Sequence, residues 1–243
     1  MNVLSLFSGI GGLELGLERV GMTVIGQVEI DPFCRRVLAK HWPEVPRHDD
    51  VRTCVGWWRS EPRPRVDVVA GGFPCQPVSD AGFKLAQADD RWLWPEMFDV
   101  IENVGPTWVI GENVSGLLRR GLATVEGDLR RAGYRVRTGK ITACAMGAPH
   151  TRERLFILAH TTRLGRCPWG NDTRSARTAP TKIPDRSTAR RDHWWTHEPR
   201  VERVAYGIPG GVDRRRALGN AVVPQVAEHI GRLILTAHVR EAA

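Results

Sequence analysis

The sequence predicts an α/β fold with a doubly wound, mostly parallel sheet, and three observations support this prediction. Short apolar runs alternate with amphipathic segments of helical period over residues 1–159. The runs are largely apolar on both faces, as in Val66–Ala70, which is typical of parallel strands that helices cover on both sides. The connections between runs and amphipathic segments are short, as they are in βαβ units.

The first half of the chain follows this alternation closely. A helical period places Leu13 and Leu17 on one face, and Pro32 opens the next helix at a typical first-turn position. The predicted elements are strand 3–7, helix 11–20, strand 23–28, helix 32–41, a short element at 51–58 within a proline-rich loop, and strand 66–70.

The second half continues the pattern and ends in a helix. Gly133 closes a long amphipathic helix as a C-terminal stop. The two strands that follow it are expected to form a hairpin-like pair. The predicted elements are helix 93–104, strand 107–110, helix 115–132, strands 134–143 and 154–159, and a closing helix 219–239.

Composition excludes several classes of protein. The 243 residues are 42% hydrophobic and 26% charged, which is ordinary for one soluble α/β domain with a small appended part. No apolar run is long enough to span a membrane, and the chain opens on a strand and not on a signal peptide. Five scattered cysteines without a C-x-x-C pair argue against a zinc site or a disulfide framework. We expect a cytoplasmic, monomeric protein without a metal.

The positive charge is concentrated near the carboxyl end of the chain. Residues 161–216 hold thirteen lysines and arginines against six aspartates and glutamates, a net +7 of the chain's total of +8. A nucleic-acid contact surface needs this asymmetry, because it must neutralise phosphates. A solvated basic linker has the same composition and stays a second interpretation. Trp169, Trp194 and Trp195 lie among the arginines and suit either base stacking or a minimal core.

One cysteine lies on a rigid turn just after a buried strand. Gly71 and Gly72 let the chain leave the strand sharply, and Pro74 and Pro77 restrict the backbone around Cys75. Ligands and chemistry collect at the carboxyl ends of such strands. A thiol held there can be a nucleophile once its pKa is lowered, or a small buried filler, and this segment alone favours neither.

Two other strand ends suggest a nucleotide-like cofactor. The glycine-rich turn from Phe7 to Gly12 enters a helix, so its backbone can approach a ligand at the helix N-terminus. Glu29 follows the second strand, where a carboxylate can bind ribose hydroxyls. The carboxylate of Asp31 can also bind ribose hydroxyls, or it can cap the N-terminus of the next helix. Together these features indicate an adenosine-containing cofactor.

Two further strand ends carry charged side chains. Glu112 follows an apolar strand, where burial can raise the pKa of a carboxyl and let it donate a proton, although a hydrogen-bonded structural glutamate is equally compatible. Alternation places Arg152 and Arg154 on one face of a later strand, with Glu153 opposite. The two arginines suit a phosphate or a base carbonyl, or else a surface ion-pair ladder.

The order of these motifs resembles that of the DNA (cytosine-5) methyltransferase family. The resemblance covers residues 1–159 and about 200–235, and the joint occurrence of the motifs is highly specific. The matching segments are Phe7–Gly12, Glu29, Gly72–Gln76, Glu112–Val114, Arg152–Arg154 and Gly219–Pro224.

The resemblance implies the Rossmann-like fold of S-adenosylmethionine-dependent methyltransferases, with a cofactor pocket. Phe7 would stack on adenine, Glu29 would bind the ribose, and Asp50 would take the adenine amino group. Asn220 would complete the pocket from the carboxyl end. The implied cofactor-binding residues are Phe7, Ser8, Gly9, Gly11, Gly12, Glu29, Ile30, Asp50, Pro74, Leu93, Asn220 and Ala221.

The resemblance also implies a nucleophile and the residues that assist it. Cys75 would attack C6 of a cytosine flipped out of duplex DNA, Glu112 would hold N3, and Arg154 would contact O2. Arg152 would steady a loop or the DNA backbone, and Asn113 belongs to the same catalytic motif as Glu112. The implied organisation is a catalytic and cofactor-binding domain at 1–159, a short target-recognition region at 160–214 and a returning C-terminal segment at 215–243.

The chain departs from the family pattern in three places. His150 stands two residues before Arg152, where the family usually has glutamine. Asp213–Leu218 stands where an arginine-rich motif is expected. The recognition region is far shorter than usual, which fits a compact phage- or mobile-element-type enzyme, weak sequence specificity, help from a partner or partial loss of function.

Three other functions are compatible with parts of the pattern. A tRNA cytosine-5 methyltransferase shares the chemistry, and the basic segment does not separate RNA from DNA. A non-catalytic nucleic-acid-binding relative would be expected to lack Cys75 or Glu112, and both are present. A thiol redox protein would need a resolving cysteine nearby in the sequence, which this chain lacks. DNA methylation, with a cognate restriction endonuclease as a candidate partner, is therefore the predicted function.

Overall fold

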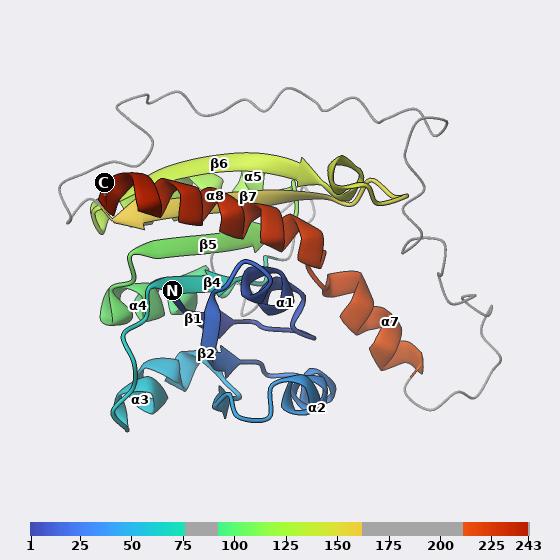
Figure 1. Ribbon diagram of the computed structural model, residues 1–243, viewed down its shortest axis with the longest axis horizontal. Helices are drawn as coiled ribbons and strands as arrows, with labels where there is room; N and C mark the ends of the chain where they lie inside the picture. The colour runs from blue at the N-terminus through green and yellow to red at the C-terminus, as the bar shows by residue number, and fades with distance from the viewer. Residues whose placement is uncertain (76–91, 162–210, 243) are drawn as a thin grey trace.

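The computed structural model describes residues 1–75, 92–161 and 211–242, and these form one seven-stranded sheet in the order β3-β2-β1-β4-β5-β7-β6 (Figure 1). The first five strands in this order are parallel, whereas β7 pairs antiparallel with both β5 and β6. The strands are β1 Asn2–Leu6, β2 Thr23–Val28, β3 Arg47–His48, β4 Val68–Gly71, β5 Trp108–Asn113, β6 Tyr134–Thr142 and β7 Glu153–Thr161. The predicted doubly wound, mostly parallel sheet is confirmed.

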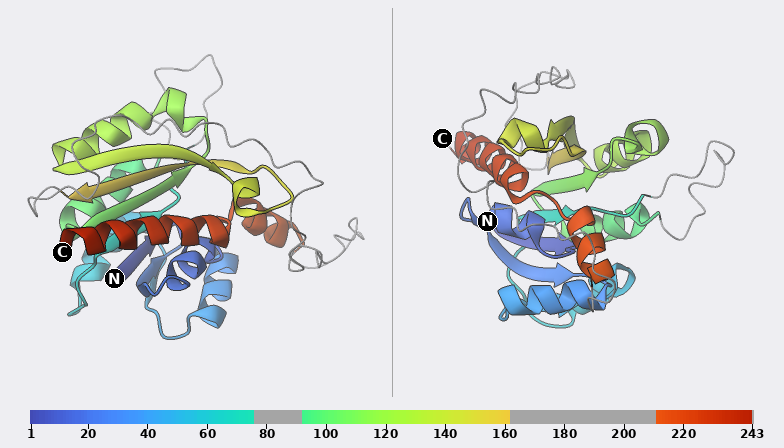
Figure 2. Two further views of the ribbon diagram at one scale, coloured as in Figure 1. Left: turned by 45° about the horizontal axis from the view of Figure 1, so that its top comes forward. Right: turned by 90° about the vertical axis from the view of Figure 1, so that its right-hand side faces the viewer.

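Helices cover both faces of this sheet (Figure 2). The helices are α1 Gly12–Glu18, α2 Pro32–His41, α3 Cys54–Arg59, α4 Trp94–Val104, α5 Leu117–Arg120, α6 Leu122–Arg131, α7 Gly211–Asn220 and α8 Pro224–Ala242, with short 3₁₀ turns at Val51–Thr53 and Ala143–Met146. Side chains of α1 and α8 share one buried cluster, and those of α3, α4 and α6 share the other. The predicted recognition region and the end of the cysteine loop lie largely outside the described residues.

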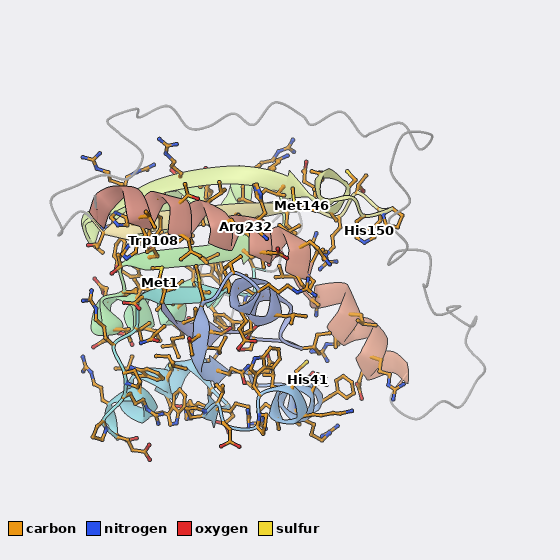
Figure 3. All side chains as sticks on the ribbon, viewed as in Figure 1. Met1, His41, Trp108, Met146, His150 and Arg232 are labelled. Carbon is orange, nitrogen blue, oxygen red and sulfur yellow. The ribbon has the colours of Figure 1, made fainter. Side chains whose placement is uncertain are left out.

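The central strands send side chains alternately into these two clusters. Val68 and Ala70 of β4 join the cluster under α1 and α8, whereas Val69 joins the cluster under α3, α4 and α6. Trp108 of β5, labelled in Figure 3, is fully buried in the same cluster as Ile230 of α8. Because both faces are covered, β4 and the first four residues of β5 are apolar, and the polar Glu112 and Asn113 come only at the end of β5.

The two ends of the chain meet where α1 packs on α8. A Cβ atom built on Gly16 would lie 2.3 Å from the carbonyl oxygen of Pro224 and 2.4 Å from Cβ of Ala227. A Cβ on Gly231 would lie 2.6 Å from a methyl group of Val20. The helices can approach this closely because the glycines have no side chain. This contact brings the junction between α7 and α8 to the carboxyl ends of the parallel strands.

Two predicted helices are wrong in their extent. The helix predicted at 115–132 is two helices, α5 and α6, which meet at Gly121. The ring of Trp92 packs 2.5 Å from the place of a Cβ at Gly121, so a larger residue there would require this ring to move. The helix predicted at 219–239 is interrupted before Pro224, which has no N–H and disfavours helical backbone in the residue before it.

The predicted strands agree with the structure more closely than these two helices do. The hairpin-like pairing of β6 with β7 is confirmed, and Gly133, with φ of 86°, ends the preceding helix as predicted. β5 extends beyond the predicted 107–110 to Asn113, because pairing with β7 continues to that residue. The two-residue strand β3 was not predicted, since its pairing with β2 is a tertiary contact.

Candidate active site

A cleft of about 420 Å³ opens at the carboxyl ends of the parallel strands, where ligands bind in sheets of this kind. Its walls come from the turn after β1, the ends of β2 and β5, the cysteine loop after β4 and the junction between α7 and α8. The predicted site residues that line it are Phe7, Ser8, Gly9, Gly12, Glu29, Ile30, Asp50, Pro74, Cys75, Leu93, Glu112, Asn113, Arg154, Asn220 and Ala221. Gly11 and Arg152 do not line this cleft, and the roles of all these residues stay predictions.

Cys75 is held at the cleft by the neighbouring strand. Its thiol donates a hydrogen bond to Oδ1 of Asn113, and Nδ2 of Asn113 donates to the carbonyl of Phe73 at 2.9 Å. Phe73 is buried, with its ring centroid 5.2 Å from that of Trp94. The Asn113 amide therefore fastens the half-buried cysteine, and the loop that carries it, to the end of β5.

Glu112 is buried at the end of β5 and faces Arg154 of β7. Its Oε1 lies 3.0 Å from Nε of Arg154. Gly72 leaves room for the carboxyl, since a Cβ there would lie 2.9 Å from Oε2. Burial raises the pKa of Glu112, and the charges of Arg154 and Arg152 only partly offset this rise. The carboxyl can therefore hold a proton at a higher pH than an exposed glutamate, and can donate it to a ring nitrogen.

The turn after β1 is strained and open. Phe7 has φ of 55° and Gly9 has φ of 56°, and a Cβ built on Gly9 would meet nothing within 4 Å. The N–H of Gly9 donates to Oε2 of Glu29 at 2.7 Å, and the N–H of Asp31 donates to Oε1 at 2.7 Å. Glu29 thus ties the turn to the end of β2. Because each carboxylate oxygen can accept more than one hydrogen bond, Glu29 can also bind ribose hydroxyls.

Apolar and acidic side chains lie beside this turn. Ile30 is 65% exposed, and it lines the cleft together with the half-buried Phe7, as suits a flat ring. Asp31 caps α2 by accepting from the N–H two residues on at 2.7 Å, so the N-cap interpretation of this residue is confirmed. Asp50 accepts in the same way at 3.0 Å and also lines the cleft.

The far end of the chain completes the cleft and packs closely on one of the glycines, Gly12. Asn220 ends α7, and Ala221 follows it. A Cβ on Gly12 would lie 2.2 Å from the carbonyl oxygen of Val222. A Cβ on Gly11 would lie 2.3 Å from the ring of Trp42. Gly11 and Gly12 therefore serve packing, which sequence reasoning did not predict.

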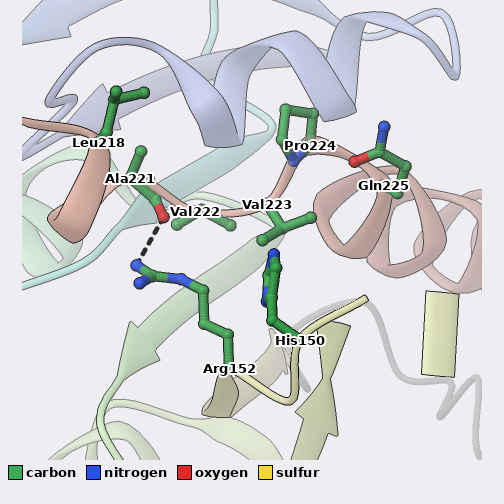
Figure 4. A pocket seen from close by; sticks show the side chains of 8 residues that line it. All are labelled: His150, Arg152, Leu218, Ala221, Val222, Val223, Pro224 and Gln225. Atoms are coloured by element: carbon green, nitrogen blue, oxygen red, sulfur yellow. Dashed lines mark hydrogen bonds between the residues drawn. The ribbon is translucent and has the colours of Figure 1, made fainter. Parts of the chain in front are cut away.

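Arg152 does not line the cleft but binds the junction between α7 and α8. Its Nη1 donates to the carbonyl of Gly219 at 2.7 Å. Its Nη2 donates to the carbonyl of Ala221, also at 2.7 Å (Figure 4). Arg152 and His150 line a second, more open hollow of about 550 Å³ against Val223 and its neighbours.

Sequence reasoning missed a buried polar network under the glycine turn. Glu14 of α1 is fully buried, and its Oε1 accepts from Oγ of Ser5 at 2.7 Å. The hydroxyls of Ser5 and Ser8 lie 3.1 Å apart, and both residues line the cleft. Burial raises the pKa of Glu14. The available signal was a glutamate three residues before the buried Leu17, on the apolar face of its helix.

Further cleft residues were not predicted, among them Cys34, Arg52 and Arg216. Burial raises the pKa of the Cys34 thiol to about 12, so this cysteine stays protonated. Among the described residues, no group of three or more histidine, cysteine, aspartate or glutamate side chains could hold a metal ion. None of the helices in the described ranges combines the length and the apolar character needed to cross a membrane.

Comparison with known families gives a match over most of the chain. The model of the family described as C-5 cytosine-specific DNA methylase matches residues 1–196.

Curated relatives have the same character. Type II methyltransferase M2.BsuMI of Bacillus subtilis is 36% identical over 168 residues, which is 65% of this chain and 42% of that protein. Type II methyltransferase M.Eco47II of Escherichia coli is 38% identical over 165 residues, 65% of this chain and 39% of that protein. The chain thus spans less than half the length of these relatives.

Solved structures share the fold. A prophage-encoded protein of E. coli, described as a DNA modification methyltransferase, matches with a TM-score of 0.55 and 26% identity over 68% of this chain and 48% of its own. The Dnmt2 methyltransferase of S. pombe matches with a TM-score of 0.54 and 21% identity, over 66% and 49%.

Proposed function

The chain belongs to the C-5 cytosine-specific DNA methylase family, and on that premise we propose that it transfers a methyl group from S-adenosylmethionine to C5 of cytosine in duplex DNA. One observation carries the proposal. A single cleft holds a cysteine on a fastened loop, a buried glutamate beside an arginine, and an open glycine turn next to a carboxylate. These are the parts that attack on a cytosine ring and binding of an adenosine-containing cofactor require.

The described residues fit S-adenosylmethionine. The cleft volume of about 420 Å³ lies in the range of small-molecule sites. Phe7 and Ile30 would hold the adenine, Glu29 the ribose and Asp50 the adenine amino group, and the open backbone at Gly9 would allow the amino-acid end to approach. Ser8, Pro74, Leu93 and the Asn220–Ala221 segment complete the walls. Once bound, the cofactor supplies an electrophilic methyl group on a positively charged sulfur.

The protein must activate the cytosine ring, because C5 is a poor nucleophile. After the Cys75 thiol has lost its proton to a base, the thiolate forms a bond to C6. The electron pair of the C5–C6 double bond moves to C4–C5, and that of the C4–N3 double bond moves to N3, which takes the proton of Glu112. C5 would then bond to the methyl carbon as the bond from that carbon to the cofactor sulfur breaks, which would leave a neutral thioether. A base would remove the C5 proton, the thiolate would leave C6, and N3 would return its proton to Glu112, which restores the ring. Arg154 contacts O2 of the cytosine. This assignment fits the geometry, because O2 lies next to N3 on the edge of the ring and Arg154 lies next to Glu112 in the site.

The base must leave the duplex before Cys75 can reach it. Flipping costs a few kcal/mol, which contacts with the protein must offset. The basic segment at 161–216 supplies charge for the phosphates.

The named relatives suggest a biological setting for the proposal. Type II methyltransferases point to a restriction–modification system, with a cognate endonuclease as partner and the cytoplasm as location. Because one of the similar structures is of a prophage-encoded protein, we also propose that this chain is encoded by a phage. We further propose that the protein acts as a monomer.

Methyl transfer from labelled S-adenosylmethionine tests the proposal directly, with duplex DNA and tRNA as parallel substrates. We expect label in DNA, its loss in Cys75→Ala, and its retention in Cys144→Ala, a matched control at a cysteine outside the cleft. Label in tRNA but not in DNA would refute the proposal that duplex DNA is the substrate. Undiminished transfer by Cys75→Ala would refute the mechanism. Bisulfite sequencing of the product then identifies the methylated sequence.

A further inference from the structure

Arg152 satisfies the backbone at the end of α7. The last carbonyls of a helix have no partner within the helix. Arg152 donates to the carbonyls of Gly219 and Ala221 at 2.7 Å each, from two different nitrogens of its guanidinium, and Figure 4 shows the bond to Ala221. Because the donor is charged, both hydrogen bonds are stronger than bonds between neutral groups.

The two bonded carbonyls flank a residue of the cofactor cleft. Asn220 lies between them in sequence, and it lines the cleft together with Ala221. Holding the backbone on both sides of Asn220 restricts where its side chain can point. Arg152 is 67 residues before Gly219 in the sequence, so this restraint comes from the residue just before β7 and not from α7 itself.

Arg152 is itself held in an uncommon conformation. Its φ of 22° is rare for a residue with a side chain, and such a backbone persists only where the surroundings impose it. Two residues later, Arg154 pairs with Glu112 at 3.0 Å. The segment from Arg152 to Arg154 thus contacts the buried acid of the cleft at one end and, at the other, the two carbonyls that flank Asn220.

We infer that Arg152 is a positioning residue for the cofactor, which acts through the Asn220 segment on S-adenosylmethionine binding and not through contact with DNA. The inference rests on the proposed function, because it takes S-adenosylmethionine as the ligand of the cleft.

Arg152→Met tests this by removing the donors while keeping most of the length of the side chain. Titration of the DNA-free protein with S-adenosylmethionine in a calorimeter should show Kd raised about tenfold or more, which corresponds to about 1.4 kcal/mol. Arg152→Lys should raise Kd less, because an ammonium keeps a charged donor. Arg130→Met is the matched control, since it removes an exposed arginine of α6 that pairs with Glu126 at 2.8 Å, and its Kd should not change.

A double-mutant cycle with Asn220→Ala tests the route of the effect. If Arg152 acts through Asn220, the doubly substituted protein should bind no more weakly than the weaker single variant. Multiplied losses of affinity would show that the two residues act independently, and would overturn the inference.

Steady-state kinetics separate positioning of the cofactor from contact with DNA. Arg152→Met should raise KM for S-adenosylmethionine, with kcat at saturating cofactor within about threefold of the parent and DNA affinity unchanged. Unchanged cofactor affinity with weaker DNA binding and a shallower salt dependence would instead identify a phosphate contact. If the methionine variant does not fold, Arg152→Lys takes its place in the same measurements. A parent protein that does not bind S-adenosylmethionine would refute the proposed function and not this inference alone.

Discussion

Gly16→Ala tests whether the cleft depends on the close approach of α1 to α8. A Cβ at Gly16 would lie 2.3 Å from the carbonyl oxygen of Pro224, 2.4 Å from Cβ of Ala227 and 2.8 Å from the backbone nitrogen of Glu228. Favourable contacts between heavy atoms lie at about 3.5–4.0 Å. The helices must therefore separate by about 1 Å, because two of these three atoms belong to backbone that cannot rotate away.

Two opposing contributions determine the change in the free energy of unfolding. Replacing a helical glycine by alanine stabilises a protein by up to about 1 kcal/mol. Overpacking of a close-packed interface costs about 1–3 kcal/mol, and the full contact between two helices is affected here. We expect a net loss of about 1–2 kcal/mol, which lowers the melting temperature by about 2–8 °C for a chain of this length.

Thermal and urea unfolding measure this change, with Gly56→Ala as the matched control. Gly56 lies in α3, and a Cβ there would meet nothing within 4 Å, so this variant should be as stable as the parent or up to about 1 kcal/mol more stable. Gly16→Ala should also bind S-adenosylmethionine more weakly, because Pro224 follows closely on Ala221 of the cleft. Equal stability of the two variants, with equal cofactor affinity, would refute the reasoning.

Three further predictions concern buried polar groups. Glu112→Gln should lower kcat about 100-fold or more, since it removes the proton donor, and methyl transfer at varied pH should fall with rising pH in the parent but not in the variant. Asn113→Ala should cost about 1–3 kcal/mol in urea unfolding, because the Phe73 carbonyl loses its donor, and should slow formation of the covalent DNA adduct; an unchanged adduct rate would contradict the role given to Asn113. The free energy of unfolding of the Glu14→Gln variant should rise relative to that of the parent as pH increases above about 4.5, as measured by unfolding at a series of pH values. The folded pKa of Glu14 lies above the unfolded one, so the parent loses stability as pH rises between the two, and a pH-independent difference would refute this assignment.

The elements that could be predicted from the sequence are those with local signals. The strand at Thr23–Val28 and the helix at Pro32–His41 have the predicted bounds, because an apolar run and a proline at the first turn identify them without reference to the rest of the chain. The break before Pro224 also had a local signal, the missing N–H of proline, although the prediction of one helix at 219–239 overlooked it.

By itself, the sequence determined the order of strands and helices and the residue types at each strand end, including the Cys75 turn and Glu112. Both follow from periodicity and turn chemistry, which act over a few residues. Only the tertiary structure decided which of two arginines faces the cleft. Arg154 meets Glu112 across the β5–β7 register, whereas Arg152 turns toward Gly219, 67 residues away. Such contacts depend on how distant segments pack, and no local pattern encodes that distance.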